Sequence, residues 1–223
     1  EEAQFVAFEI DPNKVLSMTF AMMRRGFFWD GRTLEGELSA ETWERLQEHA
    51  AAQGLDLSLF HRAKPWLVSL LVAVTSMEQQ GYSGAAGIDQ SLSDRAQQVG
   101  KERRFLETAD EQFLFFDGFS KQQQELLVRS ALEEVEAEGE EFDEITEAWK
   151  EGDVEALDRL LKDSGADIPG FLDRLLIQRN RNWVPKIEGD WWSLSGNPDL
   201  GEYTSANQQP VDFGLWQAQD GTW

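Results

Sequence analysis

Three carboxylates stand at the ends of predicted secondary-structure elements, where such groups can do chemistry. Glu9 lies near the C-terminal end of a strand predicted over residues 4–10, and Glu107 follows a strand candidate that begins at Arg103. Asp89 opens a helix predicted to run to about residue 99. A carboxylate at a strand end can ligate a hard cation or act as a general base. Asp89 and Glu107 also suit helix caps or helix ends, so Glu9 is the first candidate and these two are second.

A second group of polar residues lies on one amphipathic helix, predicted over residues 168–184. This helix carries Arg179, Asn180 and Trp183, and Pro185 is predicted to end it. A guanidinium donates two parallel hydrogen bonds to a carboxylate, so Arg179 can stabilise a developing oxyanion or pair with Glu9, and Asn180 can orient it. The alternative is a structural Glu9–Arg179 ion pair that holds the helix to the sheet.

Composition restricts the classes of partner. The 223 residues have 41% hydrophobic content, no cysteine and a formal net charge of −22, typical of a folded domain that phosphate backbones and anionic membranes would repel. We therefore expect no nucleic-acid partner. The longest apolar run, residues 66–74, is far shorter than the roughly 20 residues of a membrane span. Because the chain starts at Glu1 without a signal peptide, we expect an upstream segment to be missing, which leaves export or a periplasmic location open.

Turn and capping signals predict a mainly helical α+β fold, with a small sheet packed by several amphipathic helices. Ser39, Thr108, Ser120 and Asp153 stand where N-caps are expected, and Pro65 suits the first turn of a long apolar helix. Residues 133–155 hold twelve acidic residues against one lysine, which predicts a solvated helix face. We predict two parts: a domain over residues 1–186 and a Trp-rich tail of short strands and loops over 187–223.

Seven short motifs in order resemble the TraB/GumN family, which includes the Tiki-type proteases. The resemblance covers about residues 4–187. The motifs are Phe8-Glu9-Ile10-Asp11, Asp30-Gly31-Arg32-Thr33-Leu34, Leu38-Ser39-Ala40-Glu41-Thr42-Trp43, Lys64-Pro65-Trp66, Gly87-Ile88-Asp89, Leu106-Glu107-Thr108 with Gln112, and Arg179-Asn180 with Trp183.

The family resemblance implies a metal-dependent peptidase fold in which a central sheet presents a divalent cation. Manganese, cobalt or zinc would be the cofactor, Glu9 a catalytic residue and metal ligand, and Arg179 and Asn180 further catalytic residues. The family pattern also implies two Gly-x-x-His motifs, and neither His49 nor His61 has glycine three residues earlier. The metal is thus implied by the resemblance alone, and we expect the chain as it stands to be inactive.

The tail resembles something different. Its segment from Pro210 to Trp223 is faintly similar to a strand pair of bacterial glycoside-hydrolase-like β-propellers, which need several four-stranded blades. Trp191, Trp192 and Trp216 can stack on sugar rings or on a protein partner, or can cover an apolar face of the helical body.

Three hypotheses for function follow. The first is a TraB/GumN-like metallopeptidase or other hydrolase acting on a peptide or protein. The second is a non-catalytic helical scaffold that binds a protein partner. The third is a carbohydrate-active or sugar-binding protein that acts through the tail. The sequence leaves the substrate and the oligomeric state open.

Overall fold

The fold is mainly α-helical with one small sheet, as predicted. A computed structural model describes residues 5–83, 87–137, 140–163 and 165–195. The chain forms two compact units, Glu1–Phe171 and Leu172–Trp223. The elements of the first unit are β1 (Phe5–Phe8), α1 (Val15–Gly26), α2 (Leu34–Glu37), α3 (Ala40–Ala52), η1 (Leu57–Phe60), α4 (Pro65–Gln79), α5 (Ile88–Gln98), β2 (Glu102–Phe105), α6 (Ala109–Asp117), α7 (Lys121–Glu136), α8 (Glu140–Glu151) and α9 (Val154–Asp163). The second unit contains the π-helical segment η3 (Asp173–Ile177) and α10 (Gln178–Ser195).

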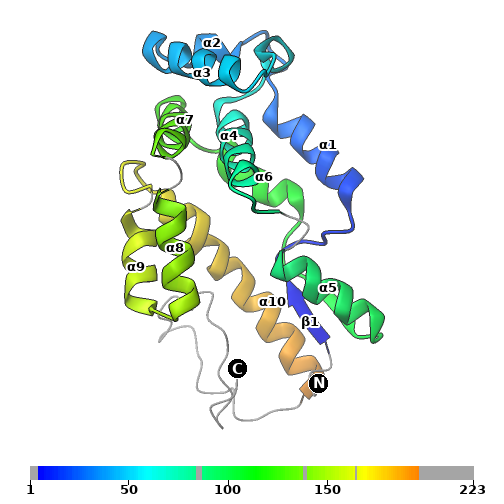
Figure 1. Ribbon diagram of the computed structural model, residues 1–223. Helices are drawn as coiled ribbons and strands as arrows, with labels where there is room; N and C mark the ends of the chain where they lie inside the picture. The colour runs from blue at the N-terminus through cyan, green and yellow to red at the C-terminus, as the bar shows by residue number, and fades with distance from the viewer. Residues whose placement is uncertain (1–4, 84–86, 138–139, 164, 196–223) are drawn as a thin grey trace. The chain divides into compact units, whose positions relative to one another are not determined.

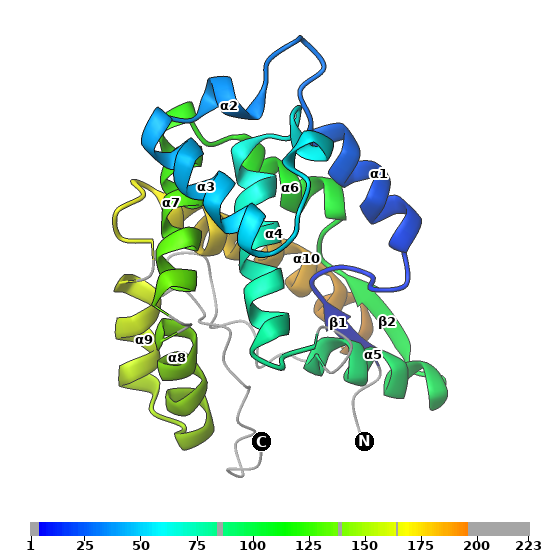
Figure 2. The ribbon, with the colours of Figure 1, turned by 45° about the horizontal axis from the view of Figure 1, so that its top comes forward.

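The sheet consists of two parallel strands that come from distant parts of the sequence. Phe5 of β1 pairs with Glu102 of β2, and Phe8 pairs with Phe105. Parallel strands need a long crossover connection, and the segment from α1 to α5 supplies it. Helix α5 lies beside the two strands (Figure 2). Both strands therefore end at the same edge of the sheet.

The predicted helix starts are confirmed in their hydrogen bonding. The side chain of Ser39 accepts a bond from the backbone N–H of Thr42 at the start of α3. Complete capping boxes begin α6 and α7, formed by Thr108 with Glu111 and by Ser120 with Gln123. At the start of α9, Asp153 accepts the N–H of Ala156 at 2.9 Å. These short-range interactions stabilise helix ends, typically by about 1 kcal/mol each.

The hydrophobic core of the first unit forms around α4, which lies between α6 and α7 (Figures 1 and 2). Trp66 is fully buried, and its ring stacks on Phe113 and Phe116 of α6 at centroid distances of 5.6 and 5.8 Å. Gly26 ends α1 where a side chain would not fit, since a Cβ there would lie 2.6 Å from Cδ2 of Leu67. The core thus fixes α1 against the start of α4.

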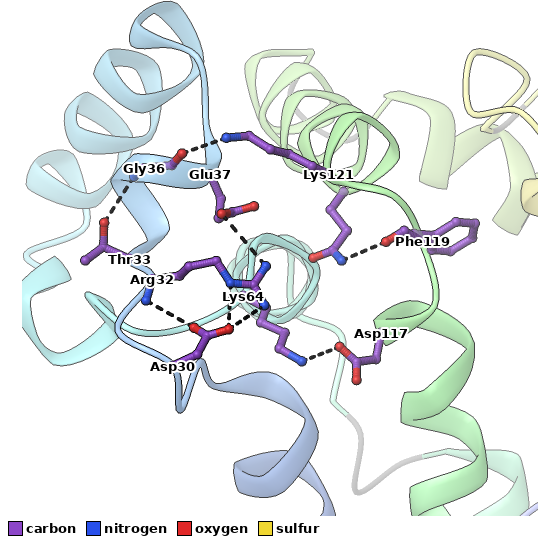
Figure 3. Close-up of polar contacts among 10 residues, drawn as sticks. Asp30, Arg32, Thr33, Gly36, Glu37, Lys64, Asp117, Phe119 and Lys121 are labelled. Carbon is purple, nitrogen blue, oxygen red and sulfur yellow. Dashed lines mark hydrogen bonds and ion pairs between the residues drawn. The ribbon is translucent and has the colours of Figure 1, made fainter.

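Polar contacts join α2 to the start of α7, and the start of α4 to the end of α6 (Figure 3). Lys64 at the start of α4 forms an ion pair with Asp117 at the end of α6. Lys121 Nζ donates to the carbonyl of Gly36 at 2.7 Å, and the Arg32 guanidinium lies 4.3 Å from the ring centroid of Phe28. The Lys64–Asp117 pair holds the C-terminal end of α6, the helix that carries Gln112.

The prediction that Pro185 ends the last helix is wrong. Helix α10 continues through Pro185 to Ser195, so residues 187–195, predicted as strands and loops, are helical. An interior proline lacks the N–H that would bond to the carbonyl four residues earlier. The turns on either side can keep their own hydrogen bonds, so a proline can kink a helix without ending it. Residues 196–223 lie outside the described residues, and the predicted domain boundary after residue 186 stays a prediction.

Truncation of a core leucine tests the packing. Leu46 of α3 is 1% exposed, so Leu46→Ala is expected to lower the free energy of unfolding by about 2–5 kcal/mol through lost burial and a residual cavity. Leu59, which is 72% exposed, provides the matched control, and Leu59→Ala should change stability by less than about 0.5 kcal/mol. Urea denaturation followed by circular dichroism measures both. Equal effects of the two substitutions would contradict the described core.

Candidate functional site

The candidate site lies where the two parallel strands end. Glu9 follows β1, Glu107 follows β2, and the backbone N–H of Glu107 donates to the carbonyl of Glu9 at 2.7 Å. Glu107 is buried and Glu9 is half-buried. The structure therefore brings Glu9, the first candidate, and Glu107, one of the two secondary candidates, to neighbouring positions on one edge of the sheet.

A third residue, Gln112 of α6, completes this edge. Its side-chain Nε2 donates to Oε2 of Glu9 at 3.0 Å. The capping box of Thr108 and Glu111 fixes the first turn of α6 directly after Glu107, which places Gln112 beside the strand ends. Gln112 stands within one of the sequence motifs, but the motif predicts no role for it. The capping box was the signal that located its helix, whereas the pairing with Glu9 depends on tertiary structure.

An ion-pair cluster anchors the same end of α6 to α1. Nε and Nη2 of Arg25 donate to the two carboxylate oxygens of Asp110 at 3.0 and 2.8 Å, and Arg24 also pairs with Asp110. Hydrogen bonds from Arg25, and then from Arg24, lower the pKa of Asp110 well below its usual range, although partial burial opposes the shift. This cluster cannot be predicted from the sequence, because its members are far apart in the chain and carry no motif.

The predicted catalytic residues Arg179 and Asn180 lie on α10 in the second unit, together with Trp183. The Arg179 guanidinium lies 5.0 Å from the Trp183 ring centroid, and its Nη1 donates to the carbonyl of Leu175 at 3.2 Å. A cation–π contact holds a guanidinium beside an aromatic face. The predicted pairing of Arg179 with Glu9 stays a prediction.

The remaining polar candidates lie elsewhere in the first unit. Asp89 is exposed in the first turn of α5, where a carboxylate interacts favourably with the helix dipole. His49 belongs to the last turn of α3, and burial lowers its pKa. His61 caps the C-terminal end of η1. None of these three residues belongs to the strands that position Glu9.

The residues at this edge do not form a metal-binding set by themselves. A zinc site takes three or four protein ligands. Throughout the described ranges, no group of three or more His, Cys, Asp or Glu side chains is placed to hold an ion. Glu9 and Glu107 supply two carboxylates, and one oxygen of Glu9 already accepts the Gln112 amide. The described donor set therefore does not fit the metal that the family resemblance implies.

The tail tryptophans proposed for stacking lie beyond what the structure describes. Trp191 and Trp192 fall within α10, but their side chains are not among those described, and Trp216 is outside the described residues. The sugar-binding hypothesis thus stays a prediction. No helix in the part of the chain that the structure covers combines the length and apolarity needed to cross a bilayer.

Fold and site together define a mainly helical α+β domain with two carboxylates at the ends of a parallel strand pair. The family model of the TraB/PrgY/gumN family matches residues 1–193, and the chain belongs to that family. This confirms the resemblance found in the sequence motifs. Comparison with curated proteins and with solved structures gave no match.

The bond between Glu9 and Gln112 can be tested by a double-mutant cycle. Glu9→Ala and Gln112→Ala are each expected to lower the free energy of unfolding, with a coupling energy of about 0.5–1.5 kcal/mol, because each removes the other's partner. Urea unfolding of the two single variants and the double variant measures the coupling. Glu48, exposed on α3, provides the control, and Glu48→Ala should be additive with Gln112→Ala. Full additivity of Glu9→Ala with Gln112→Ala would count against the bond.

The Arg25–Asp110 anchor predicts a particular pH dependence of stability. Because the folded-state pKa of Asp110 is depressed, its contribution is fully present above the unfolded carboxyl pKa of about 4 and is lost as pH falls below that value. At neutral pH, Asp110→Asn should lower the free energy of unfolding by about 1 kcal/mol, a figure discounted for partial exposure.

Urea denaturation at neutral and at acidic pH measures this difference between wild type and Asp110→Asn, which should shrink in acid. Asp158 forms an exposed pair with Lys162 on α9. Asp158→Asn is therefore the control, with a change within about 0.5 kcal/mol at both pH values. A difference for Asp110→Asn that grows in acid would contradict the described ion pair.

Proposed function

We propose that this chain is a hydrolase-like domain of the TraB/PrgY/gumN family that does not cleave peptides by itself. The observation that carries the proposal is the edge formed by Glu9, Glu107 and Gln112. Glu9 and Glu107 follow paired strands, and two neighbouring carboxylates can take part in acid–base chemistry. Among the described residues, however, no third side chain joins them to complete a metal-binding group. The sequence points the same way, since neither histidine stands in a Gly-x-x-His motif.

Within this proposal, Glu9 is the group that would accept a proton. A general base must reach its proton donor within hydrogen-bond distance and must hold a fixed orientation. The Gln112 amide provides that orientation, because it fixes one oxygen of Glu9 at 3.0 Å. Arg179 is proposed as a residue that stabilises negative charge, supported by the guanidinium chemistry and by the family membership of residues 1–193. Asn180 is proposed to orient it.

The test is isothermal titration of the purified chain with manganese, cobalt and zinc, followed by a peptide-cleavage assay with each metal. The proposal expects no binding of micromolar affinity and no cleavage, because two carboxylates make a weak site. Glu9→Ala and the exposed-site control Glu48→Ala are titrated in parallel. Micromolar binding that Glu9→Ala abolishes and Glu48→Ala retains would show a complete metal site and overturn the proposal.

A second candidate is a non-catalytic scaffold that binds a protein partner. The specific observation in its favour is the number of large apolar side chains left exposed on the first unit. Leu16 and Phe20 on α1 and Trp149 on α8 are more than half exposed. Exposed apolar side chains that gather on one face commonly mark interaction sites. A protein that binds partners through such faces needs no reactive site.

A further inference from the structure

Helix α1 presents an apolar face that no part of the described chain covers. Its inward side packs on α6 through residues such as Ala21, whereas Leu16, Phe20 and Met23 recur at helical spacing on the opposite side. These three side chains are 76%, 71% and 50% exposed. Trp29, 71% exposed, extends the face, because its indole N–H donates to the carbonyl of Arg24 in the last turn of α1. Leu16, Phe20, Met23 and Trp29 are termed the α1 outer face.

Helix α1 is basic in a chain that is acidic as a whole. Helix α1 itself carries two basic residues, Arg24 and Arg25, and no acidic one, in a chain of net charge −22, and Lys14 precedes it, whereas Asp11 and Asp30 lie further out on either side. Asp110 of α6 neutralises only part of this charge, since Arg24 and Arg25 share that single carboxylate. A partner for this face should therefore be acidic as well as apolar.

The chain itself carries a surface of that chemistry on α8 and α9. Trp149 in the last turn of α8 is 56% exposed, and Val154 and Leu161, seven residues apart on α9, are 65% and 46% exposed. The backbone N–H of Asp153 bonds to the carbonyl of Ala148, so a tight turn joins the end of α8, where Trp149 lies, to the start of α9, where Val154 lies. Residues 140–163 hold ten acidic and three basic residues. Trp149, Val154 and Leu161 are termed the α8–α9 acidic face.

The two faces cannot meet within one molecule. Helix α1 lies at one side of the first unit and the α8–α9 pair at the other, with α4 and α6 between them in both views (Figures 1 and 2). We propose that the α1 outer face of one molecule binds the α8–α9 acidic face of a second copy of this chain. Opposite charges would steer the encounter, and aromatic side chains on both faces would supply the buried centre.

The proposed contact joins two different surfaces, so each molecule has one face of each kind. Such head-to-tail contacts produce open chains or closed rings rather than a symmetric pair. Association should therefore grow with protein concentration and weaken as salt screens the charges. The proposal concerns assembly alone and does not depend on the hydrolase-like edge at Glu9.

Sedimentation velocity of the full chain tests the proposal through two variants. Phe20→Glu places a charge in the α1 outer face, and Trp149→Glu places one in the α8–α9 acidic face. Each is expected to weaken self-association at least about tenfold, because each removes a central aromatic anchor. An equimolar mixture of the two variants should form a one-to-one dimer and nothing larger. Trp149→Glu keeps an intact α1 outer face and Phe20→Glu keeps an intact α8–α9 acidic face, so the mixture has only one pair of faces that can bind. Circular dichroism confirms that both variants are folded, and Phe20→Ser and Trp149→Ser replace them if they are not.

Leu59→Glu is the matched control, since Leu59 of η1 is 72% exposed and belongs to neither face. It should associate as the wild type does. Wild-type protein that stays monomeric at high concentration and low salt would overturn the proposal. A mixture of the two variants that forms no dimer would also overturn it, and so would a Trp149→Glu variant that still associates as the wild type does while Phe20→Glu does not.

Co-sedimentation with phosphatidylserine vesicles is measured in parallel. Phe20-dependent vesicle binding by a monomeric chain would assign the α1 outer face to a lipid surface instead.

Discussion

The parallel pairing of β1 with β2 is the constraint on which the candidate site depends. Residues distant in sequence meet in this pair, with Phe5 opposite Glu102 and Phe8 opposite Phe105. Because parallel strands end at one edge, the pairing alone brings Glu9 and Glu107 together. The ladder extends past the strands themselves, since Leu106 and Glu107 donate their backbone N–H groups to Phe8 and Glu9. Helix α6 then follows within a few residues and adds Gln112.

The helical body determines how firmly this edge is held. Arg25 and Asp110 tie the start of α6 to α1, and Lys64 and Asp117 tie its end to the start of α4. Stacking of Trp66 on two phenylalanines of α6 adds an apolar contact between these ion pairs. A short helix with few buried side chains of its own is thereby fixed at both ends. The orientation of the Gln112 amide toward Glu9 depends on these contacts.

The features that depend on local interactions can be predicted from the sequence. Capping residues such as Ser39, Thr108 and Ser120 locate helix starts because their hydrogen bonds span three residues, and Glu9 and Glu107 were found as strand-end carboxylates. The continuation of α10 through Pro185 was missed, because intrinsic helix propensity cannot say when surrounding turns tolerate a proline. The Gln112–Glu9 bond and the Arg25–Asp110 pair were beyond reach, since tertiary packing creates them. Arg179 was identified as a candidate from motif order, and motif order carries no information on its distance from Glu9.

The candidate site depends on the strand pairing, and amide hydrogen exchange by nuclear magnetic resonance tests that pairing most directly. The backbone N–H groups of Leu106 and Glu107 lie beyond the end of β2, yet they donate to Phe8 and Glu9 at 2.9 and 2.7 Å. Their exchange should be slow, as for amides whose release requires strands β1 and β2 to separate. Fast exchange at both positions in the folded protein would show that β1 does not pair with β2 in this register, and that Glu9 and Glu107 do not share an edge.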